Sequence, residues 1–344
     1  MSPGHGHGGE PLFRRAQKDA SGEPVLHVGF EDDAFCGEIA AQYVDYSARS
    51  LLARLEQATG LEHHGKGEFE PAARRFAQAA LLDPSLDDAW LGLAAALAKQ
   101  GDATAAIAAL EPLIGRAPLL AYHQVLTNPD LASLREQPAI VALRAPKAGD
   151  VKLEKMTLAY SAHHSLVALV RTEQSWGACN YVQELRLYGS KTGEQALSLP
   201  LASMSETDPE CEGSDRKVLK EHRAAVKARF ATAERFLRDM GFSASPKLEL
   251  VRAPKDAEGE VSTLELPKAG LELGIDEKKV WVRKGKEVLV ERPQDLAWSI
   301  QRVGHDPTAG VAFIEWYAQV PEGCAFDEDG AGYYVFPIPT SPAP

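Results

Sequence analysis

The stretch that decides the fold runs from Asp87 to Pro118 and reads DDAWLGLAAALAKQGDATAAIAALEPLIGRAP. Four of its features recur 34 residues upstream, and the matched pairs are Gly67 and Gly101, Ala72 and Ala106, Phe76 and Leu110, and Pro84 and Pro118. A glycine lets two antiparallel helices meet in a tight turn, a small alanine lets them cross closely, and a proline ends the second helix. The sequence therefore predicts tandem helical hairpins at a fixed interval.

The second of these units, from Asp87 to Pro118, resembles the tetratricopeptide repeat family. The family's packing positions are held here by Trp90, Leu93, Ala94, Leu97, Gly101, Ala106, Leu110 and Pro118. The first unit departs from the family in its leading helix, where Thr59, Gly60 and His63 stand at places that favour leucine, glycine and an aromatic residue. The resemblance covers about residues 53–118 and implies a helical repeat domain with a concave surface for a protein partner.

Two flanking segments are expected to cap the array. Upstream, the apolar spacing from Cys36 to Leu55 predicts one further amphipathic helix. Downstream, Asn128-Pro129-Asp130 is typical of a helix start, and the apolar residues from Leu131 to Leu143 would seal the other end, with Pro138 interrupting them. Because about three stacked units are needed for stability, two repeats and two caps make a minimal array.

After Pro146 the apolar period falls to two, which predicts β-strands. The strand-length segments are 156–160, 166–171, 181–188, 195–199, 247–252, 261–266, 271–275, 280–283, 288–291, 297–303, 311–317 and 333–338. Gly285 is a hairpin-turn signal between two of them. Runs of strands broken once by a helix predict an α+β domain with an antiparallel sheet of about eight to twelve strands.

The breaking helix is predicted from Asp215 to Met240, with one apolar face and a left-handed cap at Gly241. Its opposite face carries a row of lysines and arginines, which fits either a basic strip for an anionic partner or the solvated face of a helix that covers the sheet. The expected organisation is a flexible segment 1–33, a helical repeat domain 34–146, an α+β domain 147–336 with one long covering helix, and a disordered tail 337–344.

Composition limits the function classes. The chain has 344 residues, of which 44% are hydrophobic and 25% are charged, as in ordinary globular proteins. A net charge of −12 argues against nucleic acid as the main partner, because neutralising phosphates needs a surplus of lysine and arginine. No apolar run approaches the roughly 20 residues that span a bilayer, so no membrane insertion is expected. The oligomeric state stays open.

The compartment depends on the beginning of the chain and on the cysteines. No signal peptide is visible from Met1 to Glu10, so the chain as given is expected in the cytoplasm. A periplasmic or secreted protein whose leader had been removed would begin in the same way. A disulfide between Cys179 and Cys211 would fit an oxidising compartment, and buried free thiols are the alternative.

Candidate contact residues come from the exposed positions of the first helix of the second repeat. We expect Asp88, Gly92 and Lys99 to face a protein partner. The array itself would be held together by Trp90, Leu93, Leu97, Ile107 and Leu110. Replacing Trp90 by alanine is then expected to cost roughly 3–5 kcal/mol.

Catalytic signatures are not visible in the sequence. It contains no HExxH, CxxC, phosphate-loop or Gly-x-Ser-x-Gly pattern, so we expect no catalytic residue, no cofactor and no metal site. The pairs His63-His64 and His163-His164 are poor metal sites, because neighbouring side chains point in different directions.

The sequence favours a protein-interaction scaffold with an accessory β-rich domain. One alternative is an enzyme or ligand-binding protein whose site lies in the β-rich half. Another is an envelope or secreted structural component. The repeats could also serve only to support the second domain.

Overall fold

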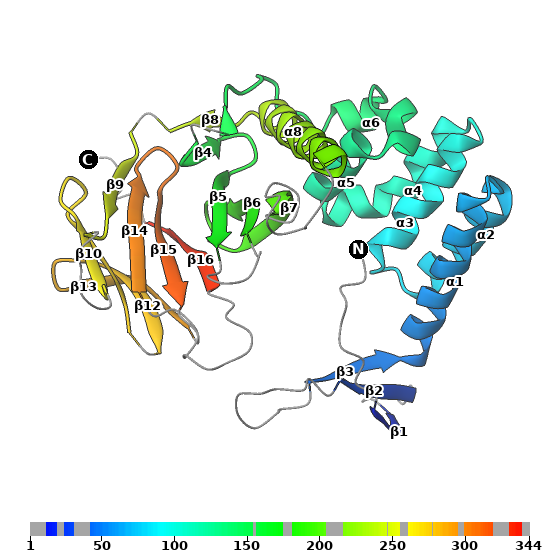
Figure 1. The fold of residues 1–344 in the computed structure, drawn as a ribbon, viewed down its shortest axis with the longest axis horizontal. Coiled ribbons are helices and arrows are strands. Elements are labelled where there is room, and N and C mark those ends of the chain that lie inside the picture. The colour runs from blue at the N-terminus through cyan, green and yellow to red at the C-terminus, as the bar shows by residue number, and fades with distance from the viewer. Residues whose placement is uncertain are drawn as a thin grey trace. The chain divides into compact units, whose positions relative to one another are not determined.

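The computed structural model describes residues 12–18, 24–30, 42–153, 156–174, 181–203, 216–245, 247–254, 261–276, 278–294, 299–318 and 330–338. The chain divides into two compact units, Met1–Leu143 and Arg144–Pro344. The division lies close to the boundary that the sequence predicts at residue 146. Helices dominate the first unit and strands dominate the second (Figure 1).

A small antiparallel sheet precedes the helices. It has the order β1-β2-β3, with β1 at Leu12–Lys18, β2 at Pro24–Phe30 and β3 at Gln42–Ser47. The segment 1–33, predicted to be flexible, thus contains β1 and β2.

The prediction of an upstream capping helix from Cys36 to Leu55 is wrong over Gln42–Ser47, because this segment forms β3. This segment is rich in tyrosine and valine, residue types that favour strands. The helix begins only at Ala48, where the Ser47 hydroxyl accepts a hydrogen bond from the Ser50 amide at 3.0 Å. That N-cap satisfies an amide that the first helical turn leaves without a backbone partner. Residues 36–41 lie outside the described residues.

The helical architecture predicted between Ala53 and Pro118 is confirmed. Four helices form two hairpins, and they are α1 (Ala48–Gly65), α2 (Phe69–Leu82), α3 (Asp87–Lys99) and α4 (Ala103–Arg116). They are followed by α5 (Pro118–Thr127), a 3-10 helix η1 (Pro129–Leu134) and the short α6 (Pro138–Val141).

The α1–α2 and α3–α4 hairpins turn in the same way. Gly67 and Gly101 adopt φ angles of +77° and +85°, which glycine reaches without the strain of a side chain. The amide of Glu68 donates to the carbonyl of His63 at 3.0 Å, and the amide of Asp102, 34 residues later, donates to that of Leu97 at 3.1 Å. Equivalent backbone bonds thus close both hairpins at the interval read from the sequence.

Small residues dominate the contacts between these helices. The fully buried alanines are Ala53, Ala72, Ala79, Ala89, Ala94, Ala96 and Ala106. Among the larger side chains, Phe76 and Leu110 are buried, as the interval predicts for Leu110. Trp90 was predicted to be a central packing residue, but it is only partly buried, packing beside Ala79 and Ala89. Alanine side chains bring the helices so close that the indole lies at the edge of the interface.

The downstream cap differs from its prediction in detail. The Asn128 side chain caps the Asp130 amide at 2.9 Å, as its position suggested, but the turn that follows is a 3-10 helix. Pro138 does not interrupt a helix there, because it occupies the first turn of α6, where its missing N–H costs nothing. Pro118 likewise begins a helix, α5, whereas the sequence predicts it only as the residue that ends α4.

The second unit contains three antiparallel sheets rather than the single sheet predicted. One has the order β7-β6-β5-β4-β8, the next β16-β15-β14-β9 and the third β10-β11-β12-β13. Their strands are β4 (Leu158–Ser161), β5 (Leu166–Gln174), β6 (Tyr181–Gly189), β7 (Gln195–Ser203), β8 (Ser243–Ala244), β9 (Glu249–Arg252), β10 (Thr263–Leu266), β11 (Leu271–Ile275), β12 (Lys279–Lys284), β13 (Glu287–Pro293), β14 (Ser299–Asp306), β15 (Val311–Ala318) and β16 (Gly330–Pro337).

The sheet that contains β15 packs on both of its faces. Val311 and Phe313 belong to a core with β4, β5 and β6, whereas Ala312 and Ile314 belong to a core with β10, β11 and β12. Successive residues of a strand point to opposite faces, so one strand supplies both cores. A strand buried on both faces reads as a continuous apolar run, which is why the sequence alone did not separate the sheets.

One long helix, α8 (Arg216–Asp239), lies against β7 in this unit (Figure 1). Its buried residues gather at the C-terminal end, at Ala233, Phe236 and Leu237, while most of residues 221–228 are exposed. Gly241 ends the helix with a φ of +72°, as predicted. The disordered tail predicted from residue 337 is wrong for its first two residues, because Pro337 ends β16 and the Ile338 amide donates to the Gly310 carbonyl at 2.8 Å. Residues 339–344 lie outside the described residues.

Candidate functional site

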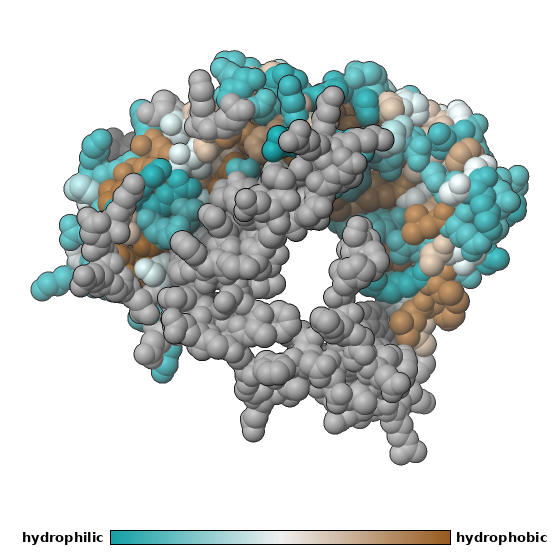
Figure 2. Space-filling model, viewed as in Figure 1, coloured by the Kyte–Doolittle hydropathy of each residue, from teal (hydrophilic) through white to brown (hydrophobic). Residues whose placement is uncertain are grey.

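The helical unit carries a groove with a volume of about 340 Å³. Most of its wall comes from α1, α3 and the corner between α5 and η1. The lining residues are Gln57, Leu61, His64, Phe76, Asp88, Leu91, Gly92, Ala95, Gln124, Asn128 and Asp130. Hydrophobic side chains interrupt the hydrophilic surface over the helices in the view of Figure 2. The groove thus combines apolar contact area with amide and carboxylate groups.

The floor of the groove depends on two glycines. The Phe76 ring is 1% exposed and lies against Gly60 of α1 and Gly92 of α3. A Cβ atom at position 92 would lie 2.5 Å from Phe76 Cε1, and one at position 60 would lie 2.9 Å from the same ring. Both distances are below any normal carbon contact, so the ring occupies the space that the missing side chains leave.

One end of the groove is closed by a charged cluster. Asp130 lies 3.4 Å from the Lys99 ammonium and 3.6 Å from His64 Nε2. Both basic groups also contact the Phe69 ring, with Lys99 Nζ 5.6 Å from its centroid and the His64 ring edge-on at 5.2 Å. The Asp130 charge is therefore balanced within the unit, and the cluster joins α1, α2, α3 and η1.

The middle of the groove has polar groups of a different kind. Asp88 is exposed, and Gln57 and Gln124 are half-buried. Among the residues that the structure describes, none donates to, accepts from or forms an ion pair with these three side chains. Polar groups at the surface of a folded protein that lack internal partners are available to a ligand or to water.

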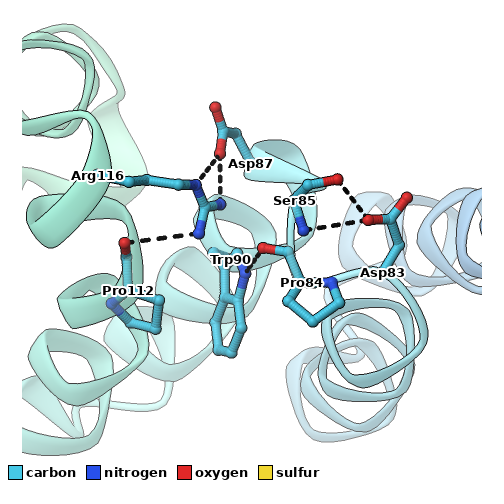
Figure 3. A network of polar contacts seen from close by, with 7 residues as sticks. All are labelled: Asp83, Pro84, Ser85, Asp87, Trp90, Pro112 and Arg116. Carbon is cyan, nitrogen blue, oxygen red and sulfur yellow. Dashed lines mark hydrogen bonds and ion pairs between the residues drawn. The ribbon is translucent and has the colours of Figure 1, made fainter.

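The start of α3, which carries Asp88, is fixed by the neighbouring polar contacts. Figure 3 shows Arg116 of α4 holding Asp87 through Nε at 2.9 Å and through Nη2. The same figure shows the Trp90 indole donating to the Pro84 carbonyl at 2.9 Å, and Asp83 accepting from the amide and hydroxyl of Ser85. Adjacent helical residues point in different directions, so Asp87 is engaged with α4 while Asp88 lines the groove.

The predicted contact residues do not share one role. Asp88 and Gly92 line the groove, whereas Lys99 lies beside it and pairs with Asp130. Gln57 and Leu61 were missed, although they stand 34 residues before Leu91 and Ala95, which also line the groove. The interval that located the hairpins could therefore have located the α1 wall.

The cysteines and the two histidine pairs are the remaining candidates that the sequence singles out. Cys179 and Cys211 lie outside the described residues, and so do Cys36 and Cys324. His63 contacts Glu68 at 2.5 Å, so the two histidines of the His63-His64 pair have different partners. His163 and His164 lie in the β4–β5 turn with ring centroids 4.6 Å apart. Within the described part of the chain, no group of three or more histidine, cysteine or acidic residues has the arrangement of a metal site.

The β-rich unit contains a polar cluster between two of its sheets. Tyr333 accepts a hydrogen bond from Arg302 at 2.8 Å, and Arg302 also pairs with Glu315. The Tyr333 oxygen lies 2.9 Å from the Val170 carbonyl and 3.0 Å from Glu315 Oε1. Burial raises the pKa of Tyr333 above its ordinary value, so its hydroxyl stays protonated. The hydrogen-bonding groups of this cluster thus find their partners within the unit, so we assign the cluster a role in holding the sheets together.

Comparison of the chain with family models, curated proteins and solved structures gives no match. Of the helices that the structure describes, none has the length and apolar character needed to cross a bilayer.

Proposed function

We propose that this chain is a protein-interaction scaffold whose helical unit is a short tetratricopeptide-type array. The support for the repeat type is the pair of hairpins that turn at Gly67 and Gly101 with equivalent backbone bonds. In such arrays the first helices of successive hairpins line a common concave surface. Here those helices are α1 and α3, continued by α5.

The observation that carries the proposal is the set of side chains that line the groove. Apolar surface from Leu61, Leu91 and Ala95 lies in the groove with Gln57, Asp88 and Gln124, whose side chains have no partner among the described residues. Binding sites commonly combine apolar walls with a few placed polar groups. A volume of about 340 Å³ is at the small end of the range of ligand pockets, roughly 300–1,000 Å³, and suits a few side chains of a peptide segment.

A protein is a better partner for this groove than a nucleic acid. No lysine or arginine is among the lining residues, and the whole chain has a net charge of −12. Phosphate groups would meet the Asp88 carboxylate with no cation among the lining residues to bind them. The role we propose for the β-rich unit is that of an accessory domain, because its Arg302–Glu315–Tyr333 cluster is bonded internally and the Tyr333 hydroxyl joins a second sheet through the Val170 carbonyl.

Site-directed photocrosslinking in the full-length chain tests this proposal. A benzophenone amino acid replaces Gln124, which lines the groove, and in a matched chain it replaces Glu111, an exposed residue of α4 that does not. Both chains are expressed in cells of the source organism and irradiated. We expect a discrete adduct with one protein from position 124 and none of that mass from position 111. Equal adducts from both positions, or none from position 124, would refute the groove as the binding surface.

A further inference from the structure

The charge of the groove indicates which peptide chemistry it accepts. Its lining contains two carboxylates, Asp88 and Asp130, and no lysine or arginine. Lys99 neutralises Asp130 from the side at 3.4 Å. The charge left over is that of Asp88, which forms no ion pair with any residue that the structure describes. The unoccupied groove thus has one carboxylate in excess.

The surroundings of Asp88 favour the binding of a cation at its carboxylate. It stands in the first turn of α3, where the helix dipole favours a negative charge. The wall beside it is apolar, formed by Leu91 and Ala95, which are 8% and 4% exposed. A cation bound against such a wall loses solvent screening and is attracted more strongly than at an open surface.

The remaining polar groups suit the backbone of an extended chain. Gln57 and Gln124 come from α1 and α5, on either side of α3 in the groove lining, and each amide can donate and accept at once. Leu61 is 57% exposed and offers apolar contact area to a neighbouring side chain. An extended peptide satisfies all three features if one of its side chains is cationic.

We propose that the groove binds an extended peptide segment of a partner protein that carries a lysine or arginine, and that this cation pairs with Asp88. The inference rests on the proposed function and adds the chemistry of the partner to it. An acidic segment is excluded by the same charge, because its carboxylate would lie near Asp88 with no cation among the lining residues to receive it.

The test uses the full-length chain and pools of blocked peptides of equal length. The pools differ only in the central residue, which is arginine, lysine, glutamine or glutamate, and their flanking positions are varied among uncharged residues. We expect the arginine and lysine pools to be retained about three- to tenfold more than the glutamine pool, the range of a partly desolvated ion pair. Retention of the glutamate pool falls below that of the glutamine pool.

Two variants make the test specific. D88N removes the charge and nearly keeps the shape, and we expect it to bring the ratio of arginine to glutamine pools to about one. E111Q removes an exposed charge from α4, away from the groove, and leaves the ratio unchanged. Circular dichroism of both variants checks that α3 is still folded.

The possible failures separate the two proposals. If the pools bind wild type without charge preference, or if the preference survives in D88N, the inference is overturned while the groove remains a peptide site. If no pool is retained above a resin that carries no protein, the inference is overturned, and the photocrosslink at position 124 decides separately whether any protein binds there.

Discussion

The two units of this chain treat their polar side chains in opposite ways. In the β-rich unit, the partly buried Arg302 and Glu315 and the buried Tyr333 bond to one another. In the helical unit, Asp88 and Gln124 line a groove and have no partner among the described residues. Polar groups that are removed from water need hydrogen-bond partners inside the protein, whereas groups open to solvent are free to bond to a ligand. The first set thus has a structural role, and the second set is where we propose that a partner binds.

The hydrophobic cores differ as well. The β-rich unit packs large aromatic and branched side chains between three layers, while the helical unit packs alanines around a few larger residues. A core of small residues depends strongly on the few large ones it contains. The following predictions use this contrast, beginning with the largest expected effect.

The first prediction concerns the aromatic residue at the centre of the helical unit. F76A should destabilise this unit by about 3–5 kcal/mol, because it empties a fully buried site between α1 and α3. W90A should cost less, about 1–3 kcal/mol, because Trp90 is only partly buried. Hydrogen exchange of the α2 and α3 amides measures both. If W90A lost more stability than F76A, the core would be centred on Trp90, as the sequence predicts.

The second prediction compares the same chemical change in the two units. E315Q should cost about 2–4 kcal/mol, because it leaves the Arg302 guanidinium, whose side chain is 17% exposed, without its counter-charge. D88N should change stability by less than about 1 kcal/mol, because Asp88 forms no pair among the described residues. Urea unfolding of each variant, followed by exchange of the amides of its own unit, gives the two values. Equal losses of stability in E315Q and D88N would contradict the proposed difference between the two units.

The third prediction concerns a histidine of the helical unit. Burial lowers the pKa of His123 in α5 from 6.5 to about 4, so the folded state binds this proton less readily than the unfolded state. The stability that the neutral ring contributes is complete above pH 6.5, falls as the pH drops from 6.5 toward 4, and is constant below that. The total loss is at most about 3.4 kcal/mol.

The pH dependence of His123 is measured by urea titrations across pH 4 to 7, with H123Q as the control. Glutamine has no proton to gain in this range, so the unfolding free energy of the wild type minus that of H123Q should fall steadily as the pH falls. A difference that stays flat would show that the ring is not protonated differently in the two states.

The fourth prediction concerns the glycines of the helices. G92A should destabilise the helical unit by about 1–3 kcal/mol, because the new methyl group overlaps the Phe76 ring. G115A is the matched control, since Gly115 lies in α4 with open space around it, and it should stabilise the unit by about 0.5–1 kcal/mol. Thermal unfolding of the two chains checks the opposite signs. If G92A also stabilised, the ring would not be locked between the glycines.

Much of the fold could be predicted from local patterns. The hairpins followed from glycine, alanine and proline at one interval, and each predicted strand segment of the second half overlaps a strand. The N-terminal sheet was missed because the tyrosines of Gln42–Ser47 also fit a helical spacing. The separation into three sheets was missed because it depends on contacts between strands far apart in the sequence.

The candidate site was predicted only in part, for a similar reason. Asp88 and Gly92 belong to the helix whose repeat pattern is clearest, and both line the groove. Lys99 was placed there because it is exposed on the same helix, but its pairing with Asp130 depends on the position of η1. Gln124 was missed because α5 begins at Pro118, which the sequence marks equally well as the end of α4.

Hydroxyl-radical footprinting of the full chain, with and without the partner captured at position 124, tests the central claim most directly. Two exposed leucines serve as an internal pair, since Leu61 lines the groove at 57% exposure and Leu81 of α2, at 72%, does not. We predict that the partner lowers the oxidation of Leu61 severalfold and leaves that of Leu81 unchanged. Protection of Leu81 with no change at Leu61 would contradict the account, because the partner would then bind a different face of the helices.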